Sequence, residues 1–258
     1  MSESTLLYTV ADGVVTITLN RPDVMNGLNR ALRAALLEAV RRAPTDGRVL
    51  VMTGAGRAFC SGQDLSGDVS PEDLDLQATL RDEYEPLLRA IYDCPIPTIS
   101  AVNGPAAGAG ANIALAADVV IAAQSAVFIQ AFTRIGLIPD AGGTYWLPRQ
   151  VGFARAMGAA LFAESIRAEQ AAQWGMIWEA VPDAEFAAHV AARAAHLAKG
   201  PTQSYALLKQ ALRASFDNDL DAQLALEARL QARAGASDDF AEGVAAFKQK
   251  RAPRFKGH

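Results

Sequence analysis

Apolar runs of strand length alternate with stretches of helical spacing along the first three quarters of this 258-residue chain. The runs "RVLVMTG", "PTISAV" and "DVVIAA" have the length and β-branched content of buried strands. From about Pro182 onward the chain is alanine-rich and helical in pattern. Such alternation predicts an α/β fold with parallel strands and crossover helices. We therefore expect a core over residues 1–199 and a helical region over residues 200–258.

Local patterns place the other expected elements. "LLYTVADGVVTITLN" predicts a hairpin, because two β-rich runs flank the turn signal Ala-Asp-Gly. Helical spacing covers four stretches: residues 29–42, 71–92, 109–117 and 142–162. "WGMIWEAV" predicts a further strand, and residues 54–68 form a loop rich in Gly, Ser and Asp. The helical tail must pack its apolar residues on the core or on another subunit; these are Phe216, Leu220, Leu224 and Leu230.

Composition narrows the class of protein. Hydrophobic residues make up 51% of the chain, which favours a folded protein over a disordered one. A net charge of −4 disfavours a general nucleic-acid binder, because such a protein needs a basic face. Two cysteines are too few for a disulfide framework and favour a reduced, cytoplasmic setting. The N-terminus lacks signal-peptide features, and no apolar run reaches the length of a membrane span.

Neither a metal site nor a nucleophilic cysteine is predicted. Cys60 has no histidine near it in sequence, and we interpret it as a small apolar residue. His189 and His196 share one face of a predicted helix, where such pairs more often line a surface or an interface than bind metal. The sequence therefore implies no metal cofactor.

Two loops rich in small residues follow predicted strands: "AFCSGQDL" at residues 58–65 and "NGPAAGAGANIALAAD" at residues 103–118. Small residues let a ligand approach the backbone closely, and two backbone N–H groups aimed at one point can stabilise a developing oxyanion. Close packing of a strand on a helix selects the same residues, so the pattern alone leaves both interpretations open. There is no G-x-G-x-x-G motif and no P-loop lysine.

Asp140 is the one acid within the mostly apolar stretch "RIGLIPDAGGTYWLPR". Pro-Asp-x-Gly is ordinary turn chemistry, which is one explanation for it. The alternative is catalytic, because burial among apolar groups raises the pKa of a carboxylate and suits it to proton transfer. The apolar candidates around it are Phe128, Phe132, Ile135, Leu137, Ile138 and Trp146.

Four motifs occur in one order: "LNRPDVMNGLN", "GRAFCSGQDL", "AVNGPAAGAGANIALAAD" and "GLIPDAGGTYWLPRQVG". With the tail pattern "GVAAFKQKRAPRF", the chain resembles the crotonase, or enoyl-CoA hydratase/isomerase, family. The resemblance implies a superhelix of ββα turns with a helical C-terminal region that trimerises. It also implies an acyl-CoA thioester substrate, so that CoA enters with the substrate and no separate cofactor is needed. A homotrimer or a dimer of trimers is expected.

The resemblance also implies site residues. By motif, the thioester oxygen receives backbone N–H groups of Gln63 and Ala109. Asp64 and Leu65 are expected near the substrate, as are Asn112 and Phe132. Asn112 could bond substrate or solvent, or it could support the fold. Lys250, in the basic tail "KQKR", is a candidate contact for a CoA phosphate, perhaps that of a neighbouring subunit, against the simpler alternative of a solvated tail.

Hydratases of this family resemble one another in carrying two glutamates, but Asn112 and Phe132 hold those positions here. Neither can take a proton, and hydration needs both a base and an acid. Asp140 instead occupies the place where several isomerases of the family keep their acid. The resemblance therefore implies an isomerase that converts a ring-epoxide phenylacetyl thioester to an oxepin, shifts 3-enoyl-CoA to 2-enoyl-CoA, or does both. The alternatives are a 2-enoyl-CoA hydratase and a non-catalytic acyl-CoA-binding or RNA-binding relative.

Overall fold

The computed structural model describes residues 4–66 and 75–258. The strands are β1 Leu6–Ala11, β2 Val14–Leu19, β3 Val49–Gly54, β4 Thr98–Val102, β5 Ala106–Ala107, β6 Val119–Ala123, β7 Val127–Ile129, β8 Ile166–Arg167 and β9 Glu179–Val181. The helices of the core are η1 Pro22–Val24, α1 Arg30–Asp46, α2 Leu76–Thr79, η3 Leu80–Tyr84, α3 Glu85–Tyr92, α4 Ala109–Leu115, η4 Ala131–Ile135, α5 Gly143–Val151, α6 Phe153–Phe162, α7 Ala168–Gln173 and α8 Asp183–Ala198. Then follow α9 Thr202–Ala214, α10 Leu220–Gly235 and α11 Asp238–Gln249.

The main sheet has the strand order β1-β2-β3-β4-β6-β9. β1 pairs antiparallel with β2, and every other pair in this sheet is parallel. The predicted hairpin is therefore confirmed; both turn residues, Asp12 and Gly13, have positive φ, as a tight two-residue hairpin turn requires. The predicted parallel strands with crossover helices are confirmed as well.

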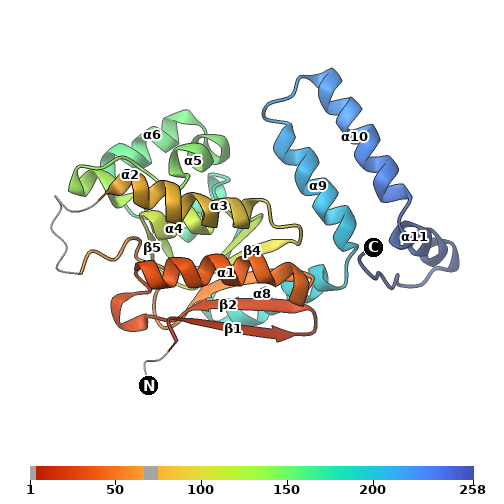
Figure 1. The fold of residues 1–258 in the computed structure, drawn as a ribbon, viewed down its shortest axis with the longest axis horizontal. Coiled ribbons are helices and arrows are strands. Elements are labelled where there is room, and N and C mark those ends of the chain that lie inside the picture. The colour runs from red at the N-terminus through yellow and green to blue at the C-terminus, as the bar shows by residue number, and fades with distance from the viewer. Residues whose placement is uncertain (1–3, 67–74) are drawn as a thin grey trace.

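Successive residues of a strand point to opposite faces of the main sheet, and each face packs into its own hydrophobic core. Leu50 and Met52 of β3 belong to the larger core with α1 and α3, whereas Val49 and Val51 pack with α8. Figure 1 shows α1 lying along the sheet with α3 beside it. Asn29 begins α1 by accepting a hydrogen bond from the Leu32 amide, as an N-cap residue does.

A second, three-stranded sheet with the order β5-β7-β8 was not predicted. Its strands are two or three residues long, which is too short to produce a readable alternation of apolar and polar residues. The helical stretch predicted over residues 142–162 is two helices, because Gly152 takes φ +78° and separates α5 from α6. The start of the helix predicted from Pro71, and the end of the loop predicted to Asp68, lie outside the described residues.

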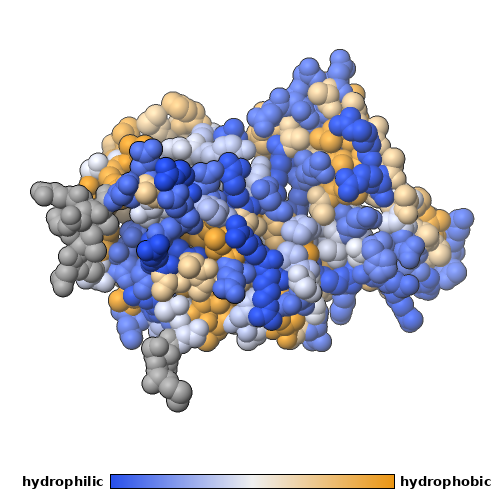
Figure 2. Space-filling view, in the orientation of Figure 1, coloured by the Kyte–Doolittle hydropathy of each residue, from blue (hydrophilic) through white to orange (hydrophobic). Residues whose placement is uncertain are grey.

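The last three helices form an arm that extends from the core (Figure 1). Two cations of α9 connect this arm to the core: Lys209 and Arg213 each form an ion pair of 2.7 Å with Asp118. Of the four apolar residues predicted to need a cover, Leu230 is buried, whereas Phe216, Leu220 and Leu224 are exposed. Figure 2 shows apolar surface over α9 and α10. No helix in the described part of the chain is long and apolar enough to cross a membrane.

Candidate active site

Backbone hydrogen bonds bind the two small-residue loops to each other. Cys60 and Ala106 form a parallel bridge, and the Ala107 amide donates to the Cys60 carbonyl over 2.9 Å. Gly62 of the first loop faces the second loop and has φ +93°. A Cβ built on Gly62 would lie 2.8 Å from the Ala107 carbonyl oxygen, so only glycine lets the loops approach this closely.

The pairing beneath the first loop aims the Gln63 amide away from the core. Leu28 donates its N–H to the Gly62 carbonyl and accepts from the Asp64 amide, so the backbone groups on both sides of Gln63 face Leu28. The N–H of Gln63 therefore points to the opposite side. Within residues 4–66 and 75–258, neither this N–H nor that of Ala109, the first residue of α4, has a hydrogen-bond acceptor.

A cavity of about 770 Å³ opens where the two N–H groups lie. Six residues singled out from the sequence line it: Gln63, Asp64, Leu65, Ala109, Phe132 and Asp140. Leu65 is exposed and Phe132 is buried, so the first lies toward solvent and the second against the core. The two unpaired N–H groups and the Asp140 carboxyl thus share one space, which is the arrangement that enolate chemistry needs.

The Asp140 carboxyl is largely buried at the cavity wall. Its Oδ1 atom is buried and has no hydrogen-bond partner in the described part of the chain. Burial raises the pKa of this carboxyl to about 6. A turn does hold the residue, because the Gly143 amide donates to the Asp140 carbonyl over 2.8 Å. The turn uses the backbone of Asp140 and leaves its side chain free for a ligand.

Asn112 supports Asp140 from below and does not line the cavity. Its side chain is fully buried; Nδ2 donates to the Asp140 carbonyl (2.7 Å), and Oδ1 accepts from Gln130 (2.8 Å). These contacts are those of its alternative role, support of the fold, and a contact of Asn112 with substrate stays a prediction. A Cβ on Gly143 would lie 2.4 Å from Asn112 Nδ2, so the glycine after the turn makes room for this amide.

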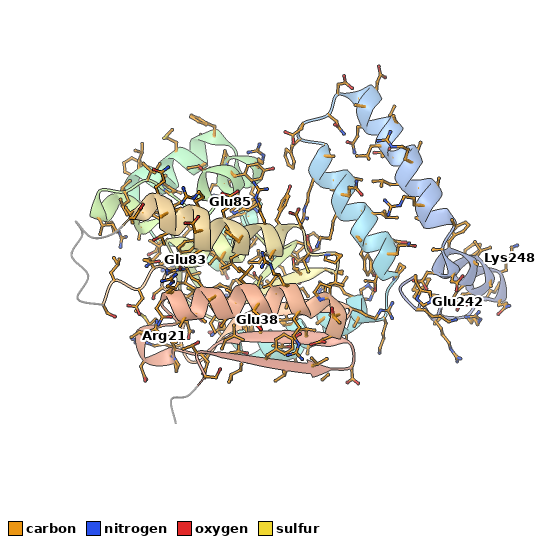
Figure 3. The ribbon with its side chains drawn as sticks, in the orientation of Figure 1. Arg21, Glu38, Glu83, Glu85, Glu242 and Lys248 are labelled. Atoms are coloured by element: carbon orange, nitrogen blue, oxygen red, sulfur yellow. The ribbon has the colours of Figure 1, made fainter. Side chains whose placement is uncertain are left out.

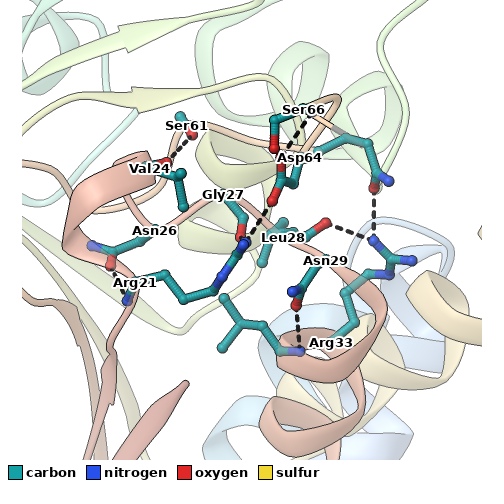
Figure 4. A network of polar contacts seen from close by, with 12 residues as sticks. Arg21, Val24, Asn26, Gly27, Leu28, Asn29, Arg33, Ser61, Asp64 and Ser66 are labelled. Atoms are coloured by element: carbon teal, nitrogen blue, oxygen red, sulfur yellow. Dashed lines mark hydrogen bonds and ion pairs between the residues drawn. The ribbon is translucent and has the colours of Figure 1, made fainter. Parts of the chain in front are cut away.

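The carboxylate of Asp64 is bonded to other groups of the protein. It accepts hydrogen bonds from the Ser66 hydroxyl and amide and pairs with Arg21 at 2.7 Å. These contacts, those of Ser66 first, lower the pKa of the Asp64 carboxyl to about 2. Figure 4 shows Arg21 bridging Asp64 to the segment before α1. Asp64 thus borders the cavity as a fixed anion of the loop.

The other residues weighed in the sequence lie outside the cavity. Lys250 directly follows α11, which belongs to the arm (Figure 1), and it does not line the cavity. Cys60 is buried, and burial raises the pKa of its thiol to about 12, which fits an unreactive small residue. No group of three metal-binding side chains occurs in the part of the chain that the structure describes. His189 bonds Glu179 over 2.7 Å.

A second cavity, of about 690 Å³, shares Leu80, Tyr84 and Asp140 with the first. Tyr92, Tyr145 and Trp146 line it, with ring centroids 4.8 to 6.4 Å apart. Sequence reasoning did not find this cavity, although Trp146 was placed near Asp140. Tyr84 and Tyr92 carry only the helical spacing of core residues, which indicates burial but not a ligand-facing wall.

The chain is similar to known proteins over almost its whole length. A model of the enoyl-CoA hydratase/isomerase family matches residues 9–258. A Rhodobacter capsulatus protein named "Probable enoyl-CoA hydratase" is 64% identical, with 100% of both chains covered. The 1,2-epoxyphenylacetyl-CoA isomerase of Escherichia coli is 48% identical, with 98% of each covered. A crystal structure of a Bacillus anthracis enoyl-CoA hydratase matches with TM-score 0.90 at 31% identity, covering 98% of this chain and 100% of that one. These matches confirm the predicted fold class.

Proposed function

Because this chain belongs to the enoyl-CoA hydratase/isomerase family, the crotonases, we propose that it is an acyl-CoA isomerase. The observation that carries the proposal is the carboxyl of Asp140, whose Oδ1 has no hydrogen-bond partner among residues 4–66 and 75–258, beside two backbone N–H groups that have no acceptor within the same residues. The positions that hold glutamates in hydratases of the family hold Asn112 and Phe132, and neither side chain can exchange a proton.

One carboxylate is sufficient for this reaction. Asp140 removes the proton from C2 of a 3-enoyl thioester, and the C2–H electron pair moves into the thioester to form an enolate. The N–H groups of Gln63 and Ala109 hold the enolate oxygen. The protonated Asp140 then returns the proton at C4, which leaves a C2–C3 double bond. A pKa of about 6 suits both transfers, because the group can accept a proton near neutral pH and give it back.

The aromatic cavity beyond Asp140 supports an acyl group that carries a ring. The two cavities share Asp140, so the proposed path of the acyl chain runs from the two N–H groups past Asp140 toward Tyr92, Tyr145 and Trp146. Planar rings pack favourably against such faces and edges. The similarity to the Escherichia coli 1,2-epoxyphenylacetyl-CoA isomerase supports the same substrate class. We therefore propose ring-epoxide acyl-CoA as a substrate beside linear 3-enoyl-CoA.

A 2-enoyl-CoA hydratase is the second candidate, favoured by the name of the Rhodobacter capsulatus relative. The test compares hydration of crotonyl-CoA with isomerisation of a 3-enoyl-CoA by the same preparation. We expect hydration to be several orders of magnitude slower, because each missing acid or base costs roughly 10²–10⁴-fold. Comparable turnover of the two substrates would overturn the isomerase proposal in favour of the hydratase.

A further inference from the structure

The side chain of Gln63 is held by two donors from different helices. Its Oε1 atom accepts from Arg33 Nη1 of α1 (2.8 Å) and from the Tyr84 hydroxyl of η3 (2.6 Å). The same residue offers its backbone N–H to the cavity. Side-chain contacts to Arg33 and Tyr84 and the backbone pairing with Leu28 thus act on the same residue.

Arg33 is a buried cation with every contact directed at this corner of the fold. It is 4% exposed and donates to the Leu28 carbonyl (2.7 Å) and to Glu83 (2.9 and 2.6 Å). Figure 4 shows Arg33 reaching Leu28 from α1, and Figure 3 shows Glu83 on the neighbouring helical run. Such an ion pair often adds little net stability over apolar residues of similar size, whereas removal of one partner is costly.

Tyr84 extends the network to the other half of the site. Tyr84 is 3% exposed and lines both cavities together with Asp140. The Cζ atom of the Arg33 guanidinium lies over the Tyr84 ring, 5.1 Å from the ring centroid. Tyr84 ends a π-helical segment, and wide turns of this kind inside helices are frequent at functional sites. The hydroxyl that bonds Gln63 therefore belongs to the wall that also faces the proposed base.

We propose that Arg33, Tyr84 and the side chain of Gln63 form a positioning unit that fixes the Gln63 N–H for the enolate oxygen. This inference rests on the proposed enolate chemistry and adds residues that act through Gln63 without touching the reacting atoms. Leu28 holds the backbone on both sides of Gln63, and the unit holds the residue between. A misplacement of about 1 Å at a reacting group can reduce turnover roughly 10²-fold, so this support acts on the rate.

The test is a double-mutant cycle with Gln63→Met and Tyr84→Phe, measured on 3-enoyl-CoA. Gln63→Met keeps the length of the side chain but removes the acceptor. We expect kcat to fall roughly 10–100-fold while KM changes less than about threefold, because the enolate contact strengthens in the transition state. Tyr84→Phe should lower kcat by roughly 3–10-fold, the worth of one hydrogen bond. In the Gln63→Met background, Tyr84→Phe should change nothing further.

The matched control is Tyr8→Phe, which removes a tyrosine hydrogen bond of 2.9 Å to Asp46 at the edge strand β1 and should leave kcat unchanged. Effects that multiply in the double variant would overturn the inference, because Tyr84 would then act on the substrate itself. A folded Gln63→Met protein with wild-type kcat would overturn it as well. If the wild type hydrates crotonyl-CoA and does not isomerise 3-enoyl-CoA, the proposed function fails; the same cycle run on hydration then decides the inference, since both reactions pass through the enolate.

Discussion

At the scale of the residue, the proposed role of Asp140 as the base makes the rate depend on pH. Its carboxyl must be ionised to remove a proton, and burial raises its pKa to about 6. We expect kcat/KM for a 3-enoyl-CoA to rise with pH through an apparent pKa near 6 and to level off above it, because kcat/KM reports the free enzyme. A pH–rate profile between pH 5 and 8 measures this limb. A flat profile over that range would be inconsistent with Asp140 as the base.

The same raised pKa gives a stability prediction with a fixed sign. A carboxyl whose pKa is higher in the folded than in the unfolded state stabilises the protein fully below the unfolded value of about 4, and this contribution is lost as pH rises through about 6. Asp140→Asn removes the buried charge. Its melting temperature relative to wild type should therefore be higher at pH 8 than at pH 5. Thermal melts at the two pH values test this, and the reverse order would count against burial of the ionised group.

At the scale of the element, Gly62 sets the distance between the two loops. Gly62→Ala forces an L-residue to φ +93° and places a Cβ 2.8 Å from the Ala107 carbonyl oxygen. We expect a loss of about 1–3 kcal/mol of stability and a fall in turnover, since the loops that carry both N–H groups must separate. Chemical denaturation and steady-state kinetics measure the two effects.

The matched control for Gly62→Ala is Gly158→Ala inside α6. A Cβ on Gly158 meets nothing within 4 Å, and alanine favours the helix by up to about 1 kcal/mol. This variant should be as stable as wild type or more so, with unchanged turnover. If Gly62→Ala behaved like Gly158→Ala, the close approach of the loops would not be required for activity.

The elements that sequence reasoning found are those with a long local pattern. The hairpin, β3, β4, β6 and α1 follow from apolar periodicity and a turn signal, and the order of four motifs led to the family. The second sheet was not predicted because its strands are only two or three residues long, too short for a readable alternation of apolar and polar residues. A supporting role for Asn112 was one of the sequence-based alternatives, but its partner was not predicted, because Asn112 and Asp140 are 28 residues apart and no local spacing encodes their hydrogen bond.

At the scale of the whole molecule, the arm bears apolar surface that one chain does not cover. Leu208, Leu212 and Leu224 line a groove between α9 and α10 and are more than half exposed, and Phe247 of α11 is 86% exposed. Contiguous apolar surface of this kind is typical of subunit interfaces. We propose that the chain forms a trimer or a dimer of trimers through residues 200–258. Lys250 is then a proposed contact to the CoA of a neighbouring subunit.

Light scattering at micromolar protein should therefore give three or six times the 27.3 kDa mass of one chain. Leu212→Glu places a charge in the groove and should shift the mass toward that of one chain. The control is Glu227→Gln: Glu227 lines the same groove, but the substitution buries no new charge, so the mass should shift less. A monomer mass for the wild type would rule out this assembly.

Proton transfer by Asp140 is tested most directly by the turnover of a 3-enoyl-CoA by Asp140→Asn beside wild type at pH 8. The substitution keeps the size of the side chain and the backbone bonds of Asp140 to Asn112 and Gly143. We predict that the variant folds, binds acyl-CoA and loses roughly 10²–10⁴-fold or more in kcat. Near-normal turnover by the folded variant would contradict proton transfer by Asp140 and leave Asp140 as a residue of the turn.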